Sequence, residues 1–146
     1  MADAGALGKP AIRRVVETAL YVDDMSRAVA FYHGTLGLRV LGSEGARLTA
    51  MDAGGATVLL LFKRGATTEG FEFDGGRIPP HDGAGPAHVA FAVDVAEFER
   101  WEQRLRERGV AIESRVTWSR GGRSLYLRDP DGHSVELVTP GTWETY

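Results

Sequence analysis

Two segments with the same alternation of apolar and polar residues lie about 70 residues apart in the chain. Because successive side chains of a strand point to opposite faces, this alternation predicts a strand with one buried face. The apolar positions are Val16, Leu20 and Val22 in residues 14–22, and Val89, Phe91 and Val93 in residues 88–94. We expect both apolar faces to pack against helices.

Each predicted strand leads into an amphipathic helix. Apolar residues at helical spacing predict helices over residues 25–36 and 96–108. Asp24 suits the N-cap of the first helix, and Gly37 and Gly109 stand where glycine commonly ends a helix. Both helices are therefore expected to have defined ends and one apolar stripe.

Three further strands are predicted after each helix. They cover residues 39–41, 46–52 and 56–63 in the first half of the chain, and residues 110–118, 124–127 and 134–139 in the second half. The order βαβββ therefore occurs twice, which indicates an internal repeat. We predict an α+β fold built from two βαβββ modules.

The module boundaries follow from composition. Residues 64–87 contain six glycines and three prolines, and connections longer than about 15 residues are usually functional or disordered. We predict a flexible N-terminal segment, a first module, a linker, a second module and a tail. These parts span residues 1–13, 14–65, 66–87, 88–140 and 141–146.

Three polar residues stand at matching places in this pattern. Glu17 and His88 open the two repeats on the face opposite the packing face, and Glu136 lies on the same face of the last strand, after the turn Asp129-Pro-Asp-Gly132. A mid-strand carboxylate needs a cation, a donor or water. Taken singly, a strand histidine is more often structural than a ligand, Glu17 could lie in water, and Glu136 could pair with an arginine. Sheets that pair side by side would bring the three together in a concave cleft.

Composition removes several classes of protein. The 146 residues carry a formal charge of −3, which gives no reason to expect a nucleic-acid or anionic-membrane surface. The chain has no cysteine, so disulfide and thiolate chemistry are excluded. No apolar run approaches the roughly 18 residues of a membrane span, and residues 1–10 lack the core of a signal peptide. We expect a cytoplasmic protein.

Several motifs together resemble the vicinal oxygen chelate superfamily, which includes glyoxalase I, methylmalonyl-CoA epimerase, fosfomycin-resistance transferases, extradiol dioxygenases and bleomycin-binding proteins. The motifs are Glu-Thr-Ala-Leu-Tyr-Val-Asp-Asp from Glu17, Phe31-Tyr32, Leu36-Gly37-Leu38, the restart at His88, and Tyr126 followed by Asp-Pro-Asp-Gly and Glu136. The resemblance covers about residues 14–140. It implies that the two modules form a curved eight-stranded sheet around a metal cleft.

The resemblance also implies a metal site. The superfamily's ligand positions correspond to Glu17, His88 and Glu136, and the fourth ligand of glyoxalase-type members falls at about Leu59, which cannot bind metal. One nitrogen and two carboxylates suit Mn²⁺ or Fe²⁺, with Zn²⁺, Ni²⁺ or Co²⁺ as alternatives. A carboxylate ligand that detaches, such as Glu136, could also serve as a base.

Other residues are expected around this cleft. Tyr126 corresponds to a tyrosine that faces the metal-bound ligand in related enzymes, so it is a candidate catalytic hydrogen-bond donor, although it could be an ordinary hairpin tyrosine. Tyr21, His81, Trp118 and Arg123 are candidate substrate contacts. His33 and His133 are expected in solvent.

Three departures from the superfamily's patterns bear on the reaction. Thr117 stands where extradiol dioxygenases have an acid–base histidine, which argues against ordinary catechol cleavage. Ala19 and Thr145 stand where fosfomycin transferases have a threonine and an arginine, which disfavours fosfomycin.

Two function classes remain open. The first is a divalent-metal-dependent lyase, isomerase or dioxygenase that chelates a small molecule through vicinal oxygens. The second is a binding or resistance protein of the bleomycin type, which holds a small molecule without turnover. We expect a homodimer in either case. If the modules pair across chains, Glu17 would come from one subunit and His88 and Glu136 from the other.

Overall fold

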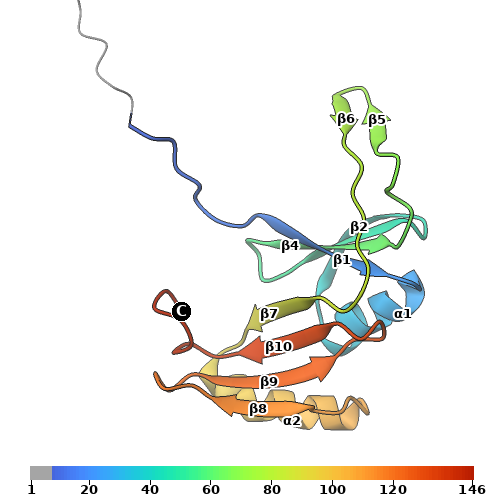
Figure 1. Ribbon diagram of the computed structural model, residues 1–146. Coiled ribbons are helices and arrows are strands. Elements are labelled where there is room, and N and C mark those ends of the chain that lie inside the picture. The colour runs from blue at the N-terminus through green and yellow to red at the C-terminus, as the bar shows by residue number, and fades with distance from the viewer. Residues whose placement is uncertain (1–7) are drawn as a thin grey trace, which may run out of the picture.

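The strands form two four-stranded sheets and one small hairpin in the computed structural model, which describes residues 8–146 (Figure 1). The first sheet has the order β1 (Glu17–Val22), β4 (Val58–Lys63), β3 (Leu48–Asp52) and β2 (Arg39–Glu44). The second has the order β7 (His88–Ala92), β10 (Ser134–Val138), β9 (Arg123–Arg128) and β8 (Ser114–Thr117). In each sheet the opening strand runs parallel to the last strand of its module, and the other neighbours are antiparallel. The predicted α+β class with two βαβββ modules is confirmed.

The first helix is continuous but changes its winding. It consists of α1 (Met25–Val29) and the π-helical segment η1 (Ala30–Thr35). The Asp24 carboxylate accepts a hydrogen bond of 3.0 Å from the backbone N–H of Arg27, which confirms Asp24 as the N-cap. The buried face of this helix comprises Met25, Ala28, Phe31, Tyr32 and Thr35.

The second helix begins with a short 3₁₀ turn, η2 (Val95–Glu97), and continues as α2 (Phe98–Glu107). Phe98 and Leu105 bury its apolar stripe. Arg104 at its end donates hydrogen bonds to the carbonyls of Thr35 and Gly34, at 2.7 and 3.1 Å. The second helix is therefore tied directly to the end of the first.

One hydrophobic core serves both modules. It combines residues of the first module such as Val22 and Leu61 with residues of the second such as Leu125 and Val135, all fully buried. Burial of this kind stabilises by roughly 25 cal/mol for each Å² of apolar surface, so a core that spans both modules joins them energetically. None of the helices in residues 8–146 is long and apolar enough to span a bilayer.

The two main sheets stay separate within the described part of the chain. Within residues 8–146, β1 pairs only with β4 and β7 pairs only with β10, so each sheet has one free edge at its opening strand. The eight strands therefore do not join into one sheet inside a single chain. Residues 1–7 of the predicted N-terminal segment lie outside the described residues, and residues 8–16 form no helix or strand.

The linker is more ordered than its composition suggests. It contains the hairpin β5 (Phe71–Phe73) and β6 (Gly76–Ile78), which projects from the body (Figure 1). Two hydrogen bonds join Thr67, which is buried, to His81 at the base of the hairpin. Thr67 Oγ1 donates to the His81 carbonyl, and the His81 N–H donates to the Thr67 carbonyl at 3.0 Å. Gly83 lies so close to the Tyr21 ring that an added Cβ would stand 2.4 Å from a ring carbon. The linker is thus fastened to the first sheet.

Candidate functional site

Glu136 occupies the centre of the second sheet, on the face opposite the helices. Its neighbours Val135 and Leu137 point into the core, so strand alternation turns Glu136 to the open face. The residue is nevertheless only 6% exposed. Its Oε1 atom accepts a hydrogen bond of 2.5 Å from Ser124 Oγ on the adjacent strand β9. One carboxylate oxygen is therefore held, and the other, Oε2, is turned elsewhere.

His88 supplies a nitrogen beside that second oxygen. The His88 Nε2 and Glu136 Oε2 atoms are 3.3 Å apart, and His88 Nδ1 lies 3.1 Å from the carbonyl oxygen of Ser134. A carbonyl only accepts, so Nδ1 carries the proton of this hydrogen bond. In neutral His88 the Nε2 lone pair then faces a carboxylate. Two acceptors at this distance repel, and a cation or a proton between them removes the repulsion.

Two aromatic residues border this pair. The rings of Tyr126 and His88 stack with centroids 6.3 Å apart, and Tyr126 lies directly opposite Glu136 in the strand register. Burial raises the pKa of the Tyr126 hydroxyl, hydrogen bonding and charge at Glu136 raise it further, and a hydrogen bond with Ser124 offsets part of this effect. Tyr126 therefore remains a protonated donor at neutral pH. Trp118 donates from Nε1 to Ser124 Oγ at 2.8 Å.

Glu17 lies on the corresponding face of the other sheet. It opens β1 and is exposed. Leu20 and Val22 lie on the other face of the strand and point into the core. Because the two sheets do not join within one chain, the predicted three ligands do not meet there: residues 8–146 contain no cluster of three or more histidine, cysteine or acidic side chains arranged to hold a metal ion. The described chain brings together His88, Glu136 and Tyr126, and leaves Glu17 apart.

The strand register corrects the position expected for a fourth ligand. Glu136 pairs with Ala90, two residues after His88, and in the first module the residue paired with Ala19, two after Glu17, is Leu60. Leu59, the position expected from the sequence, is fully buried in the core. The equivalent of Glu136 is thus Leu60, which cannot bind metal either.

Tyr21 and His81 form a second polar pair, on the open face of the first sheet. The Tyr21 hydroxyl is 2.6 Å from His81 Nδ1, and the His81 ring meets Phe62 edge-on with centroids 4.6 Å apart. Burial, and after it the charge of Asp82, raises the pKa of Tyr21. These two candidate substrate contacts therefore touch each other, through the fastened linker.

Arg123 is placed away from the site. Its guanidinium stacks on the Phe98 ring at 3.9 Å from the centroid and pairs with Glu99 at 2.8 Å. Both partners belong to α2, so Arg123 faces the helix. The expectation that it lines the cleft entrance is corrected: the alternation that turns Ser124 and Tyr126 to the open face turns Arg123 to the opposite one.

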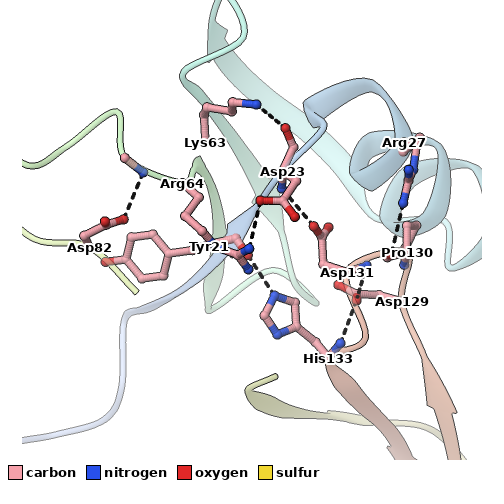
Figure 2. A network of polar contacts seen from close by, with 11 residues as sticks. Tyr21, Asp23, Arg27, Lys63, Arg64, Asp82, Asp129, Pro130, Asp131 and His133 are labelled. Atoms are coloured by element: carbon pink, nitrogen blue, oxygen red, sulfur yellow. Dashed lines mark hydrogen bonds and ion pairs between the residues drawn. The ribbon is translucent and has the colours of Figure 1, made fainter. Parts of the chain in front are cut away.

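His133 is buried, contrary to the expectation that it lies in solvent. It is 1% exposed, its Nδ1 accepts from the backbone N–H of Ala87 at 2.8 Å, and its Nε2 lies 2.8 Å from the carbonyl oxygen of Tyr21. Figure 2 shows His133 inside the network that links the end of β1 to the β9–β10 turn. In the same network the backbone N–H of Asp23 donates to Asp131 at 2.8 Å. His33 is exposed as expected.

The chemistry of the donor set on the second sheet fits a divalent cation. His88 Nε2 and Glu136 Oε2 face each other. The other nitrogen of His88 is bonded to the Ser134 carbonyl, and the other oxygen of Glu136 accepts from Ser124 Oγ. Ligand histidines and carboxylates in metalloproteins are typically oriented by such outer partners. The sequence analysis missed Ser124, although it lies two residues before Tyr126 and therefore on the same face.

Comparisons with known proteins identify the family and agree with the fold. A family model described as the Glyoxalase/Bleomycin resistance protein/Dioxygenase superfamily matches residues 14–137. The glutathione transferase FosA of Serratia marcescens is 34% identical over 123 residues, which cover 81% of this chain and 74% of that protein. The metallothiol transferase FosB of Staphylococcus saprophyticus is 45% identical over 53 residues, only 36% of this chain and 35% of its own length. The crystal structure of lactoylglutathione lyase from Agrobacterium tumefaciens has 33% identity and a TM-score of 0.83, and the match covers 93% of this chain and 99% of that one.

Proposed function

The chain belongs to the glyoxalase/bleomycin resistance protein/dioxygenase superfamily, and from this premise we propose that it is a divalent-metal-dependent enzyme. Its substrate is a small molecule that binds through two neighbouring oxygen atoms. One observation carries the proposal: His88 Nε2 and Glu136 Oε2 face each other at 3.3 Å, while their other polar atoms are already bonded. Mn²⁺, Fe²⁺, Ni²⁺ or Zn²⁺ would suit these donors.

The residues around the pair have separate tasks. His88 and Glu136 hold the cation, which when bound would polarise the substrate oxygens as a Lewis acid. Tyr126 keeps its proton and donates a hydrogen bond to a substrate oxygen, since its pKa is raised. Glu136, buried and beside the cation, is the candidate base. The apolar rim of the first sheet, together with Tyr21 and His81, contacts the rest of the substrate.

We propose that a second copy of the chain completes the site. Each sheet has one of its two edges at its opening strand, β1 or β7, and these strands begin with Glu17 and His88. Pairing of these edges across two chains would bring Glu17 of one copy to His88 and Glu136 of the other. It would also cover strand edges that are otherwise open to aggregation. The resulting homodimer holds two equivalent clefts.

The names of two well-covered relatives support a substrate class. One is a glutathione transferase and the other a lactoylglutathione lyase, so both are named for glutathione or a derivative. We propose that this chain acts on a small oxygenated compound that carries or receives a glutathione-type thiol. Lyase or isomerase chemistry is favoured over transfer to fosfomycin, because Ala19 and Thr145 replace the residues that fosfomycin transferases use.

Metal analysis tests the proposal most directly. Protein purified without chelator is expected to contain close to one divalent ion per chain, and His88→Ala to lose it. Added Mn²⁺ at about a hundredfold excess over its Kd should stabilise the wild type by roughly 2.7 kcal/mol. Light scattering measures whether the protein is a dimer. Glu17→Ala should weaken metal binding and leave the dimer intact. If the wild type binds none of the four metals, the enzyme hypothesis is wrong, and the alternative of a small-molecule binding protein of the bleomycin-resistance type takes its place.

A further inference from the structure

We propose that Trp118 and Ser124 form a directional hydrogen-bond relay that positions Glu136 and limits it to one oxygen for metal binding. This inference rests on the proposed metal-dependent function and adds two positioning residues to it. It also predicts which cations the site selects. Neither residue carries a charge or reaches the cation, so both act through Glu136.

The relay is buried at its centre. Ser124 is fully buried and Glu136 is 6% exposed, and their side chains meet at 2.5 Å, from Oγ to Oε1. Trp118 donates to the same hydroxyl, with Nε1 2.8 Å from Oγ. Water is therefore kept from the Oε1 side of the carboxylate, and the serine hydroxyl is its main partner there.

Its direction follows from the donors present. An indole N–H only donates, so Trp118 must give its hydrogen to Ser124 Oγ. The serine has a single hydroxyl hydrogen, and Glu136 Oε1 accepts it at 2.5 Å. Tyr126 lies beside both groups and keeps its own proton, so it acts there as a donor and does not compete for the serine hydrogen. With Oε1 engaged, Oε2 is the oxygen presented to His88 Nε2. In the absence of Trp118 the serine hydroxyl would be free to rotate away.

The fold holds Trp118 in place. Its backbone N–H donates to the carbonyl of Gly122 at 2.7 Å, which closes the tight turn between β8 and β9. Gly122 is pressed against the C-terminal segment, where a Cβ would stand 2.6 Å from the Gly141 carbonyl carbon. The backbone N–H of Gly122 donates to the carbonyl of Gly141 at 3.1 Å. The C-terminal segment thus fixes the turn that carries the first donor of the relay.

A carboxylate restricted to one oxygen favours some cations over others. Ca²⁺ takes six to eight oxygen ligands and often uses both oxygens of a carboxylate. Mn²⁺ and Zn²⁺ accept fewer ligands and bind imidazole nitrogen well. The relay therefore favours Mn²⁺ over Ca²⁺, and a merely structural role for Ser124 would not affect this preference.

Calorimetric titration with Mn²⁺ and with Ca²⁺ tests the relay in the full chain. Ser124→Ala should weaken Mn²⁺ binding by about 10- to 100-fold, the range for lost outer-shell partners, and should narrow the preference over Ca²⁺. Trp118→Phe should have a smaller effect in the same direction. The double variant should equal Ser124→Ala, because Trp118 acts through Ser124. Ser43→Ala is the matched control: it removes the hydroxyl of an exposed serine on β2 of the first sheet, and its Mn²⁺ affinity should equal that of the wild type.

The outcomes separate the two proposals. A wild type that binds Mn²⁺ together with a folded Ser124→Ala that binds it equally well would overturn the relay and leave the proposed function standing. A wild type that binds no metal overturns both. If Ser124→Ala fails to fold, as judged by circular dichroism, Trp118→Phe decides: unchanged Mn²⁺ affinity and unchanged preference over Ca²⁺ contradict the relay.

Discussion

The open faces of the two sheets have the same backbone plan and opposite chemistry. In the second sheet the positions beside Ala90 are Glu136 and Tyr126, with Ser124 one step along. The first-sheet equivalents beside Ala19 are Leu60 and Ala50, with Leu48 one step along. The repeated architecture thus carries a polar centre in one copy and an apolar surface in the other. The opening positions, Glu17 and His88, are polar in both copies, and so are the equivalent residues Asp52 and Arg128 in the same row.

In the proposed site, this difference corresponds to a division of labour between the modules. The second holds a carboxylate with its donors in place, while the first offers one exposed carboxylate and an apolar face bordered by Tyr21, Phe62 and His81. An apolar face suits the body of a substrate, and a polar centre suits its reacting atoms. The repeat supplies the shared frame, and single substitutions on it supply the functions.

The largest expected effect contrasts equivalent positions of the two modules. Glu136→Gln removes a charged ligand, so Mn²⁺ affinity should fall by more than the roughly 100-fold that outer-shell partners can cost. Leu60→Ala changes the matching position of the first module, which supplies no ligand, and should leave the affinity unchanged. Calorimetric titration of both variants provides the comparison. Equal losses would show that the two faces share metal binding and would end the division of labour.

A second prediction concerns the joint between the modules. His133→Ala breaks the hydrogen bonds to Ala87 and Tyr21 in a buried place, which should lower the free energy of unfolding by about 2–4 kcal/mol. His33→Ala, at an exposed position, should change it by no more than about 0.5 kcal/mol. Urea denaturation followed by circular dichroism measures both. An effect of His133→Ala no larger than that of the control would mean that His133 does not help to hold the modules together.

The smallest expected effect appears at alkaline pH. Burial raises the pKa of Tyr32 far above its usual value of 10.0, and Asp129 of the other module, which accepts its hydrogen bond at 2.7 Å, raises it further. The stabilisation by Tyr32 is complete below pH 10, where its hydroxyl keeps its proton in both the folded and the unfolded state. Above pH 10 only the unfolded state releases it, so stability should fall by about 1.4 kcal/mol per pH unit.

Tyr32→Phe removes the part of the stability loss above pH 10 that comes from this hydroxyl. The slope of unfolding free energy against pH, measured by urea denaturation between pH 9 and 11, should become shallower by that amount. Burial, and after it the charge of Asp94, also raises the pKa of the half-buried Tyr146, but less far than that of Tyr32, so Tyr146→Phe should change the slope less than Tyr32→Phe does. A wild type and a Tyr32→Phe variant with equal slopes would show that Tyr32 titrates normally.

The sequence predicted the modules and the faces of the central strands because both depend on local periodicity. Alternation alone turned Glu17, His88 and Glu136 away from the core, and the structure has all three on the open faces. The same rule could have assigned Ser124 to the open face and Arg123 to the helix. Gly121 and Gly122 precede β9, so the residue at which the strand begins is not marked in the sequence.

The remaining differences come from contacts between distant segments. His133 follows a turn motif that is usually exposed, and it is buried because the end of β1, 112 residues earlier in the chain, packs over it. The linker gave a similar result: its glycines and prolines suggested a mobile connection, whereas Thr67, His81 and Gly83 fasten it to the first sheet. No local pattern encodes which surface a turn or a linker meets.

The free edges at β1 and β7 have a consequence for genetics. If each cleft takes Glu17 from one chain and His88 and Glu136 from another, a chain altered at Glu17 and a chain altered at His88 are both impaired alone. Produced in the same cell, they form mixed pairs in which one cleft carries both alterations and the other carries neither. Two defective alleles would therefore complement each other, whereas alleles altered at His88 and at Glu136 would not.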